Sequence, residues 1–78
     1  MASRAQNERK FKQWEELPGG GRRYFRDYGG RVGGRARYIK EVDPAERTIR
    51  FAQEIYDQTD RLVVVHEKFP VDLGHKQM

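Results

Sequence analysis

The chain has 78 residues, about half the length of an ordinary domain, and its 16 Val, Ile, Leu and Phe residues place it at the boundary below which charged chains stay unfolded. These values exclude a multidomain enzyme and predict one small domain with a thin core, which a bound partner or self-association as a homodimer would supplement. The lack of cysteine excludes disulfides, thiolate nucleophiles and Cys-containing metal sites, and the lack of a long apolar run predicts a cytoplasmic protein that spans no membrane.

Charge is distributed unevenly along the chain. Residues 1–40 carry 11 Lys or Arg and 4 Asp or Glu, whereas residues 41–78 carry 5 and 8. This asymmetry predicts that the first half of the chain contacts an anionic partner.

The N-terminal segment has a helical spacing of apolar residues. Phe11, Trp14 and Leu17 recur every third residue, which predicts a helix over residues 4–17 that the following proline and glycines stop. Because residues 2–10 contain no large apolar side chain, we expect the start of this helix to fray and only its second half to pack on the rest of the domain.

Alternating apolar residues and turn signals predict four strands after the glycines, at residues 22–28, 36–42, 48–56 and 62–65. The predicted fold is α+β, a short N-terminal helix followed by a four-stranded antiparallel β-meander, and a small half-open β-barrel is the alternative. We divide the chain into a helix with a frayed start and a glycine-rich stop at 1–20, the meander at 21–73 and a flexible tail at 74–78.

Arginines that follow glycine pairs, with aromatic residues between them, are the first candidate site. The pattern over residues 19–38 resembles the arginine–glycine boxes of RNA-binding proteins. Guanidinium groups bind phosphate oxygens, glycines let the backbone approach a polyanion, and aromatic rings stack on bases. A mobile loop with solvated arginines and with tyrosines in a sheet face is the structural alternative. The predicted nucleic-acid-binding residues are Arg22, Arg23, Tyr24, Arg26, Tyr28, Arg31, Arg35, Arg37 and Tyr38.

These features favour a small nucleic-acid-binding domain that contacts RNA or single strands, since no helix carries the residues that read a duplex groove. The alternative is a metal-independent, toxin-like ribonuclease in which His66, Glu67 and His75 transfer protons. Adjacent residues of a strand point to opposite faces, so His66 and Glu67 are not expected to share a cleft. A third interpretation is an interaction or inhibitor module that binds an acidic protein. No metal site and no cofactor are predicted.

Overall fold

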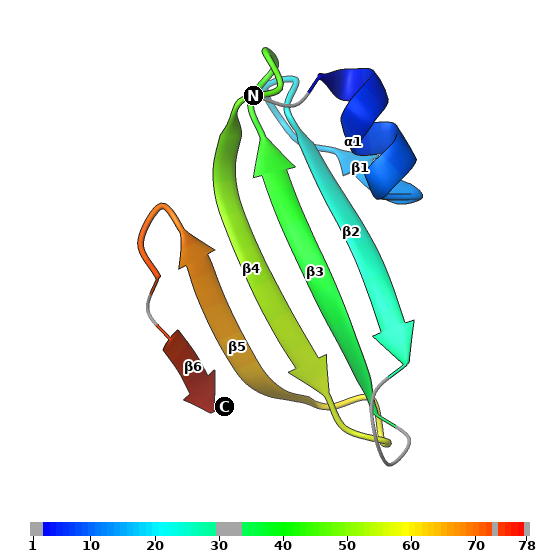
Figure 1. The fold of residues 1–78 in the computed structure, drawn as a ribbon, viewed down its shortest axis with the longest axis vertical. Helices are drawn as coiled ribbons and strands as arrows, with labels where there is room; N and C mark the ends of the chain where they lie inside the picture. The colour runs from blue at the N-terminus through cyan, green and yellow to red at the C-terminus, as the bar shows by residue number, and fades with distance from the viewer. Residues whose placement is uncertain (1–2, 30–33, 73, 78) are drawn as a thin grey trace.

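The computed structural model describes residues 3–29, 34–72 and 74–77, and Figure 1 shows a short helix beside an antiparallel sheet. The described elements are α1 (Arg4–Lys10), β1 (Gln13–Glu16), β2 (Arg22–Gly29), β3 (Arg35–Val42), β4 (Thr48–Tyr56), β5 (Leu62–Phe69) and β6 (Gly74–Gln77). Each strand pairs with the next one along the chain, so the sheet order follows the sequence from β1 to β6. Within the described ranges, no helix has the length and apolar character that crossing a membrane requires.

The predicted meander is confirmed as β2 to β5, and the short strands β1 and β6 extend it at its two edges. Because β1 and β6 lie at opposite edges, the described strands form an open sheet and not the half-open barrel named as the alternative. The expected flexible tail is wrong for Gly74–Gln77, which pairs with β5. This short segment contains no apolar residue, so backbone pairing with β5 orders it.

The predicted helix over residues 4–17 is wrong in its extent. The helix ends at Lys10, and Gln13–Glu16 instead forms β1 and pairs with β2. The expected fraying of the helix start is also wrong, because Ser3 forms a capping box with Gln6 and the Asn7 side chain is buried. The first turns of the helix are therefore held by polar contacts, which apolar periodicity does not detect.

Two turns of the same design connect the longest strands. Asp43 and Asp57 each accept bonds from the backbone N–H groups two and four residues later. The residue three positions after each Asp has a positive φ of 65°; these residues are Glu46 and Asp60. These turns lie between the predicted strands 36–42, 48–56 and 62–65, and the Asp side chains stabilise them by bonding their own backbone.

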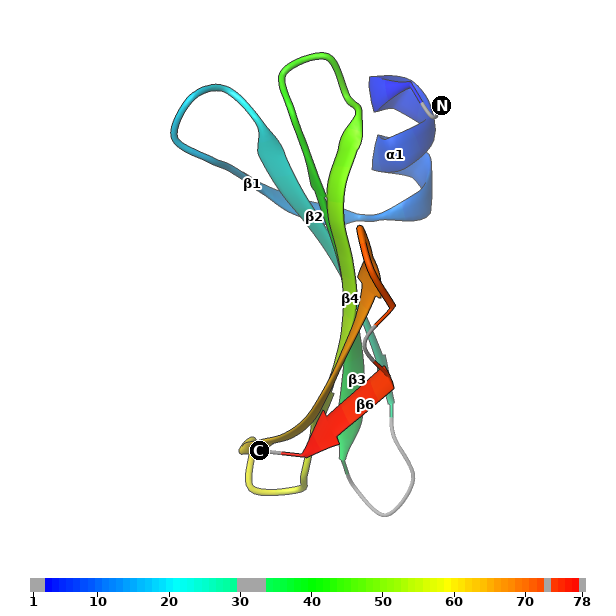
Figure 2. The ribbon, with the colours of Figure 1, turned by 90° about the vertical axis from the view of Figure 1, so that its left-hand side faces the viewer.

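The helix covers only part of one face of the twisted sheet (Figure 2). We call this side the helix face and the opposite side the ladder face. Strand alternation and register assign the following side chains to the helix face: Tyr24, Arg26 and Tyr28 of β2, Ala36, Tyr38, Lys40 and Val42 of β3, and Phe51, Gln53 and Ile55 of β4. Phe11, Tyr24 and Val42 form the buried cluster beneath the helix, and Tyr38 and Phe51 pack against it.

Two glycines of the arginine–glycine pattern are required by the fold. A Cβ atom at Gly21 would lie 2.3 Å from the carbonyl oxygen of Val42, and one at Gly34 would lie 2.5 Å from that of Tyr56. At these two positions the glycine accommodates the chain's own backbone, which is the general reason for glycine at a close backbone approach. Their presence therefore does not by itself indicate contact with a polyanion.

We expect Gly34→Ala to lower the free energy of unfolding by about 1–3 kcal/mol, because the added methyl meets rigid backbone. Gly29→Ala is the matched control, since a Cβ atom there has no neighbour within 4 Å among the described residues. Thermal unfolding of both variants measures the difference. Equal stability of the two variants would contradict this role of Gly34.

Candidate nucleic-acid interface

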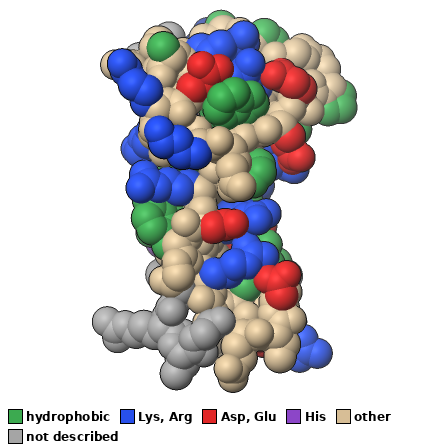
Figure 3. Space-filling view, turned by 90° about the vertical axis from the view of Figure 1, so that its right-hand side faces the viewer, with side chains coloured by type: hydrophobic (Ala, Val, Ile, Leu, Met, Phe, Trp, Pro, Cys, Tyr) green, Lys and Arg blue, Asp and Glu red, His purple; other side chains and the backbone are tan. Residues whose placement is uncertain are grey.

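The ladder face is named for a chain of ion pairs that crosses five strands. Glu15, Arg23, Glu41, Arg50 and Glu67 come from successive strands, and their neighbouring contacts measure 2.6, 3.0, 3.1 and 2.6 Å. Arg23 and Arg50 donate hydrogen bonds to these carboxylates, and the bonds raise the pKa of both guanidinium groups. The largest effect comes from Glu41 for Arg23 and from Glu67 for Arg50. Acidic and basic side chains alternate on the right of Figure 3, on the side away from α1. The predicted phosphate ligand Arg23 is thus committed to carboxylates of its own chain.

Arg35 and Arg37 lie on the same ladder face and are also paired. Arg37 donates to both carboxylate oxygens of Asp27, at 2.7 and 3.1 Å, and these bonds lower the pKa of Asp27. Arg35 lies 2.7 Å from Asp60, and its guanidinium stacks 4.0 Å from the centre of the Tyr56 ring. These contacts neutralise both predicted phosphate ligands within the protein.

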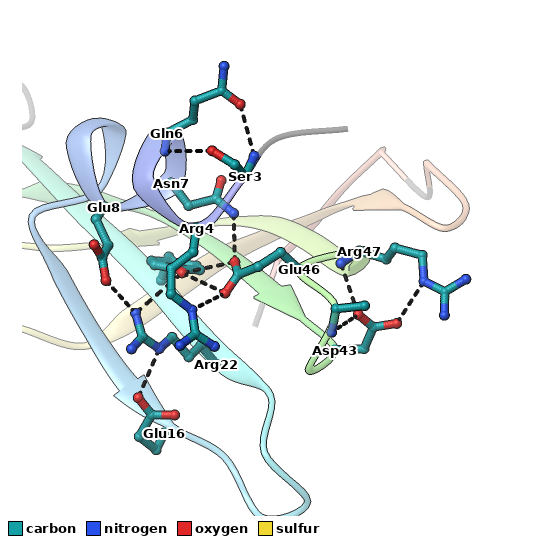
Figure 4. Close-up of polar contacts among 12 residues, drawn as sticks. Ser3, Arg4, Gln6, Asn7, Glu8, Glu16, Arg22, Asp43, Glu46 and Arg47 are labelled. Carbon is teal, nitrogen blue, oxygen red and sulfur yellow. Dashed lines mark hydrogen bonds and ion pairs between the residues drawn. The ribbon is translucent and has the colours of Figure 1, made fainter.

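A buried polar cluster around Glu46, which we call the Glu46 clasp, joins α1 to the sheet (Figure 4). The Glu46 carboxylate accepts bonds from Arg4 at 2.9 Å, Asn7 at 3.0 Å and the hydroxyl of Tyr24 at 2.9 Å. Burial of the Tyr24 ring, with further help from Glu46, raises the pKa of its hydroxyl. Tyr24 is fully buried, so its ring is not at the surface where the sequence predicted stacking on bases.

Arg22 lies next to the Glu46 clasp and is paired as well. Its guanidinium donates to Glu8 and to Glu16, both at 2.8 Å, and the bond to Glu8 raises its pKa. Arg31, the remaining predicted phosphate ligand of the glycine-rich loop, lies outside the described residues.

Three predicted residues do come together on the part of the helix face that α1 leaves uncovered. Arg26 is exposed, and its guanidinium lies 4.8 Å from the centre of the Tyr28 ring. Tyr28 remains 42% exposed and meets Tyr38 edge to face, with ring centres 5.5 Å apart. The structure adds Phe51, whose ring centre is 6.3 Å from that of Tyr38. The sequence placed Phe51 in a strand but did not identify it as a site residue.

Two lysines lie at the margins of these rings. Lys68 of β5 lies 5.3 Å from the centre of the Tyr38 ring, and Lys10 lies 5.8 Å from that of Phe11. Neither lysine, nor Arg26, forms an ion pair with any described residue. Basic side chains also gather on the left of Figure 3, which is the side of α1. The rings and the three cations around them form a surface that we call the aromatic–basic surface. Its residues are Lys10, Arg26, Tyr28, Tyr38, Phe51 and Lys68.

A hollow of about 340 Å³ lies within the aromatic–basic surface at the end of the helix. Phe11, Tyr28, Tyr38 and Phe51 supply its rings, and Ala36, which pairs with Tyr28, also lines it. Lys10 and Arg26 complete the lining, and none of the described lining residues is acidic. The hollow combines aromatic surface with unpaired positive charge, which suits a planar anionic ligand.

His66 and Glu67 of the ribonuclease alternative lie on opposite faces of the sheet. Glu67 is on the ladder face and bonds Arg50, whereas His66 is on the helix face, where its Nε2 lies 2.6 Å from an Asp72 carboxylate oxygen. The expectation that His66 and Glu67 do not share a cleft is confirmed. His75 pairs with His66 in the β5–β6 register, but its side chain is not described.

Among the described residues, no group of three or more His, Asp or Glu side chains is placed to hold a metal ion. No protein-family model, curated protein or solved structure matches this chain. The site must therefore be interpreted from its own chemistry.

Proposed function

We propose that the protein binds single-stranded nucleic acid, with RNA as the favoured ligand, on the aromatic–basic surface. The observation that carries this proposal is the contrast between the two faces. Arg23, Arg35 and Arg37 are paired with carboxylates on the ladder face. Lys10, Arg26 and Lys68 lie beside aromatic rings and form no ion pair with a carboxylate of the described residues. Exposed rings stack on bases of any sequence, and unpaired cations contact the phosphates between them.

The same geometry favours a single strand over a duplex. The rings lie on a sheet face, and α1, the described helix, has seven residues and contributes its buried Asn7 to the contact with the sheet. A duplex keeps its bases stacked on one another, so aromatic side chains on a sheet reach only the bases of an unpaired strand. The proposed contacts carry no base-specific hydrogen bonds, and we expect weak sequence preference.

We expect Tyr28→Ala to weaken binding of a fluorescent twelve-nucleotide RNA by about 1–3 kcal/mol, because stacking on the exposed ring is lost. Tyr28→Phe keeps the ring and should bind as the parent does. The double variant Lys10→Gln with Lys68→Gln should reduce the slope of log affinity against log salt by about 1.4, the value for two phosphate contacts on a single strand. Fluorescence anisotropy at several salt concentrations measures both effects.

Arg47→Gln is the matched control for charge, since this exposed arginine pairs with Asp43 in the turn between β3 and β4 and is not part of the aromatic–basic surface. It should leave the salt slope of RNA binding unchanged. Unchanged affinity in both the tyrosine and the double-lysine variants would refute the proposal. Dependence on the lysines but not on Tyr28 would mean that the surface contacts only phosphates and that Tyr28 does not stack on bases.

The same samples distinguish a binding protein from a ribonuclease. We expect labelled RNA to stay intact in the presence of a chelator and His66→Gln to bind it as the parent does. Metal-independent cleavage that His66→Gln abolishes, with the unfolding temperature preserved, would establish the ribonuclease in place of a simple binding protein.

A further inference from the structure

The hollow in the aromatic–basic surface is walled by rings at different angles. Tyr28 and Tyr38 meet at 88°, and Tyr38 and Phe51 at 47°, so the rings form adjoining walls of a concave surface. Ala36 stands between Tyr28 and Ile55 in the cross-strand row of β2 to β4 and leaves room that a larger side chain would fill. Walls of this kind accept one flat aromatic group by stacking and edge-to-face contact.

The size of the hollow limits what it can hold. Its volume of about 340 Å³ is at the lower end of the range of about 300–1,000 Å³ that is typical of small-molecule sites. One nucleotide of a strand is a ligand of this class, whereas a longer stretch must continue over the open part of the helix face. The hollow is also bounded on one side by Lys10 and Phe11 at the end of α1.

Two cations are positioned at the rim for an anionic group. Arg26 donates one bond to the carbonyl oxygen of Lys10, at 3.3 Å, which ties its guanidinium to the end of the helix. A guanidinium has five N–H donors, so this contact leaves others for a phosphate. Lys10 is exposed and also lines the hollow, so its ammonium group is a second cation beside Arg26.

We infer that the hollow binds one nucleotide, with its base among Tyr28, Tyr38 and Phe51 and its phosphate between Lys10 and Arg26. This inference rests on the proposed function and identifies the unit of nucleic acid that the surface holds most closely. A base without phosphate lacks the charge contact, and a sugar phosphate without base lacks the rings. Both should therefore bind more weakly than the complete nucleotide.

The test is an NMR titration of the ¹⁵N- and ¹³C-labelled full chain with AMP, adenosine and ribose 5-phosphate. We expect AMP to shift the resonances of Tyr28, Ala36 and Tyr38, and both partial ligands to bind at least tenfold more weakly. Ala36→Leu fills the hollow and should weaken AMP binding at least tenfold. Ala45→Leu makes the same change in an exposed turn and should leave AMP affinity unchanged.

Binding of ribose 5-phosphate as tight as that of AMP would overturn the inference, because the site would then recognise only an anion. Shifts outside the hollow, or no effect of Ala36→Leu, would also overturn it. The twelve-nucleotide RNA is titrated in parallel. If this RNA binds with its dependence on Tyr28 while AMP leaves the hollow unaffected, the one-nucleotide site is wrong and the proposed function stands. If AMP occupies the hollow and the RNA does not bind, the nucleotide site stands and the proposed function is wrong.

Discussion

We expect Phe11→Ala to lower the free energy of unfolding by about 3–5 kcal/mol, the range for removing a buried aromatic side chain. Phe11 is 2% exposed and packs on Tyr24, with ring centres 6.0 Å apart. It follows α1 directly and closes the small cluster between helix and sheet. Because the core of this chain is thin, few other contacts can compensate for the loss.

Trp14→Ala is the control for this prediction. Trp14 is 39% exposed on the edge strand β1, so its removal should cost less than about 2 kcal/mol. Urea unfolding followed by circular dichroism measures both variants, and Phe11→Leu replaces Phe11→Ala if the latter does not fold. A loss in Trp14→Ala as large as that in Phe11→Ala would contradict this account of the core.

Local sequence signals were sufficient to predict the centre of the sheet. The turns that begin at Asp43 and Asp57 depend on side-chain bonds within a few residues, and such bonds can be recognised from the sequence. The strand Thr48–Tyr56 was predicted with its observed bounds, since its alternating residues end at one of these turns. Hydrogen bonds within a turn and the alternation of residues along a strand are both local, so together they predict where these strands begin and end.

The N-terminal segment could not be predicted from periodicity because its structure depends on distant residues. Phe11 and Trp14 fit a helix, but Gln13–Glu16 pairs with β2 through contacts such as Glu15 with Arg23 and Glu16 with Arg22. These contacts contribute stability only when the two segments lie side by side. The contact between Asn7 and Glu46 spans 39 positions and leaves no local signal.

Only part of the candidate site could be predicted, because contacts across strands are not visible in the sequence. Net charge identified a basic first half, but it did not show that Arg23 and Arg37 are neutralised by Glu41 and Asp27 across strands. Lys68 belongs to the acidic half of the chain and reaches the rings only through the sheet order. Knowledge of the register would have placed Phe51 beside Tyr38, since both belong to the helix face.

The Glu46 clasp gives the second large stability prediction. We expect Glu46→Ala to lower the free energy of unfolding by about 2–5 kcal/mol, because Asn7 and the hydroxyl of Tyr24 lose their acceptor in a buried position. Arg4 is half exposed and can turn toward water, so it adds less to this loss. Removal of residues 1–9 deletes two of the three donors and should also destabilise the fold, although the sequence predicted that the start of the helix frays.

The clasp also predicts a pH dependence. Burial alone would raise the pKa of Glu46, but the bonds from Arg4, Asn7 and Tyr24 outweigh it and lower the pKa. A carboxyl with a lowered pKa in the folded state contributes stability that is fully present above its unfolded pKa of about 4.3. That contribution is lost as the pH falls through the lower pKa of the folded state.

Glu46→Gln isolates this contribution from those of Asp27, Asp43, Asp57 and Asp72, whose pKa values are lowered as well. The parent should be more stable than Glu46→Gln at pH 7, and the difference should shrink as the pH falls below about 4.3, because a protonated Glu46 resembles the amide. Urea unfolding of both proteins between pH 7 and pH 3 measures this difference. A difference that stays constant over that range would mean that the charge of Glu46 does not hold α1 on the sheet, and that other contacts, such as those of Phe11 and of Arg22 with Glu8, dock the helix.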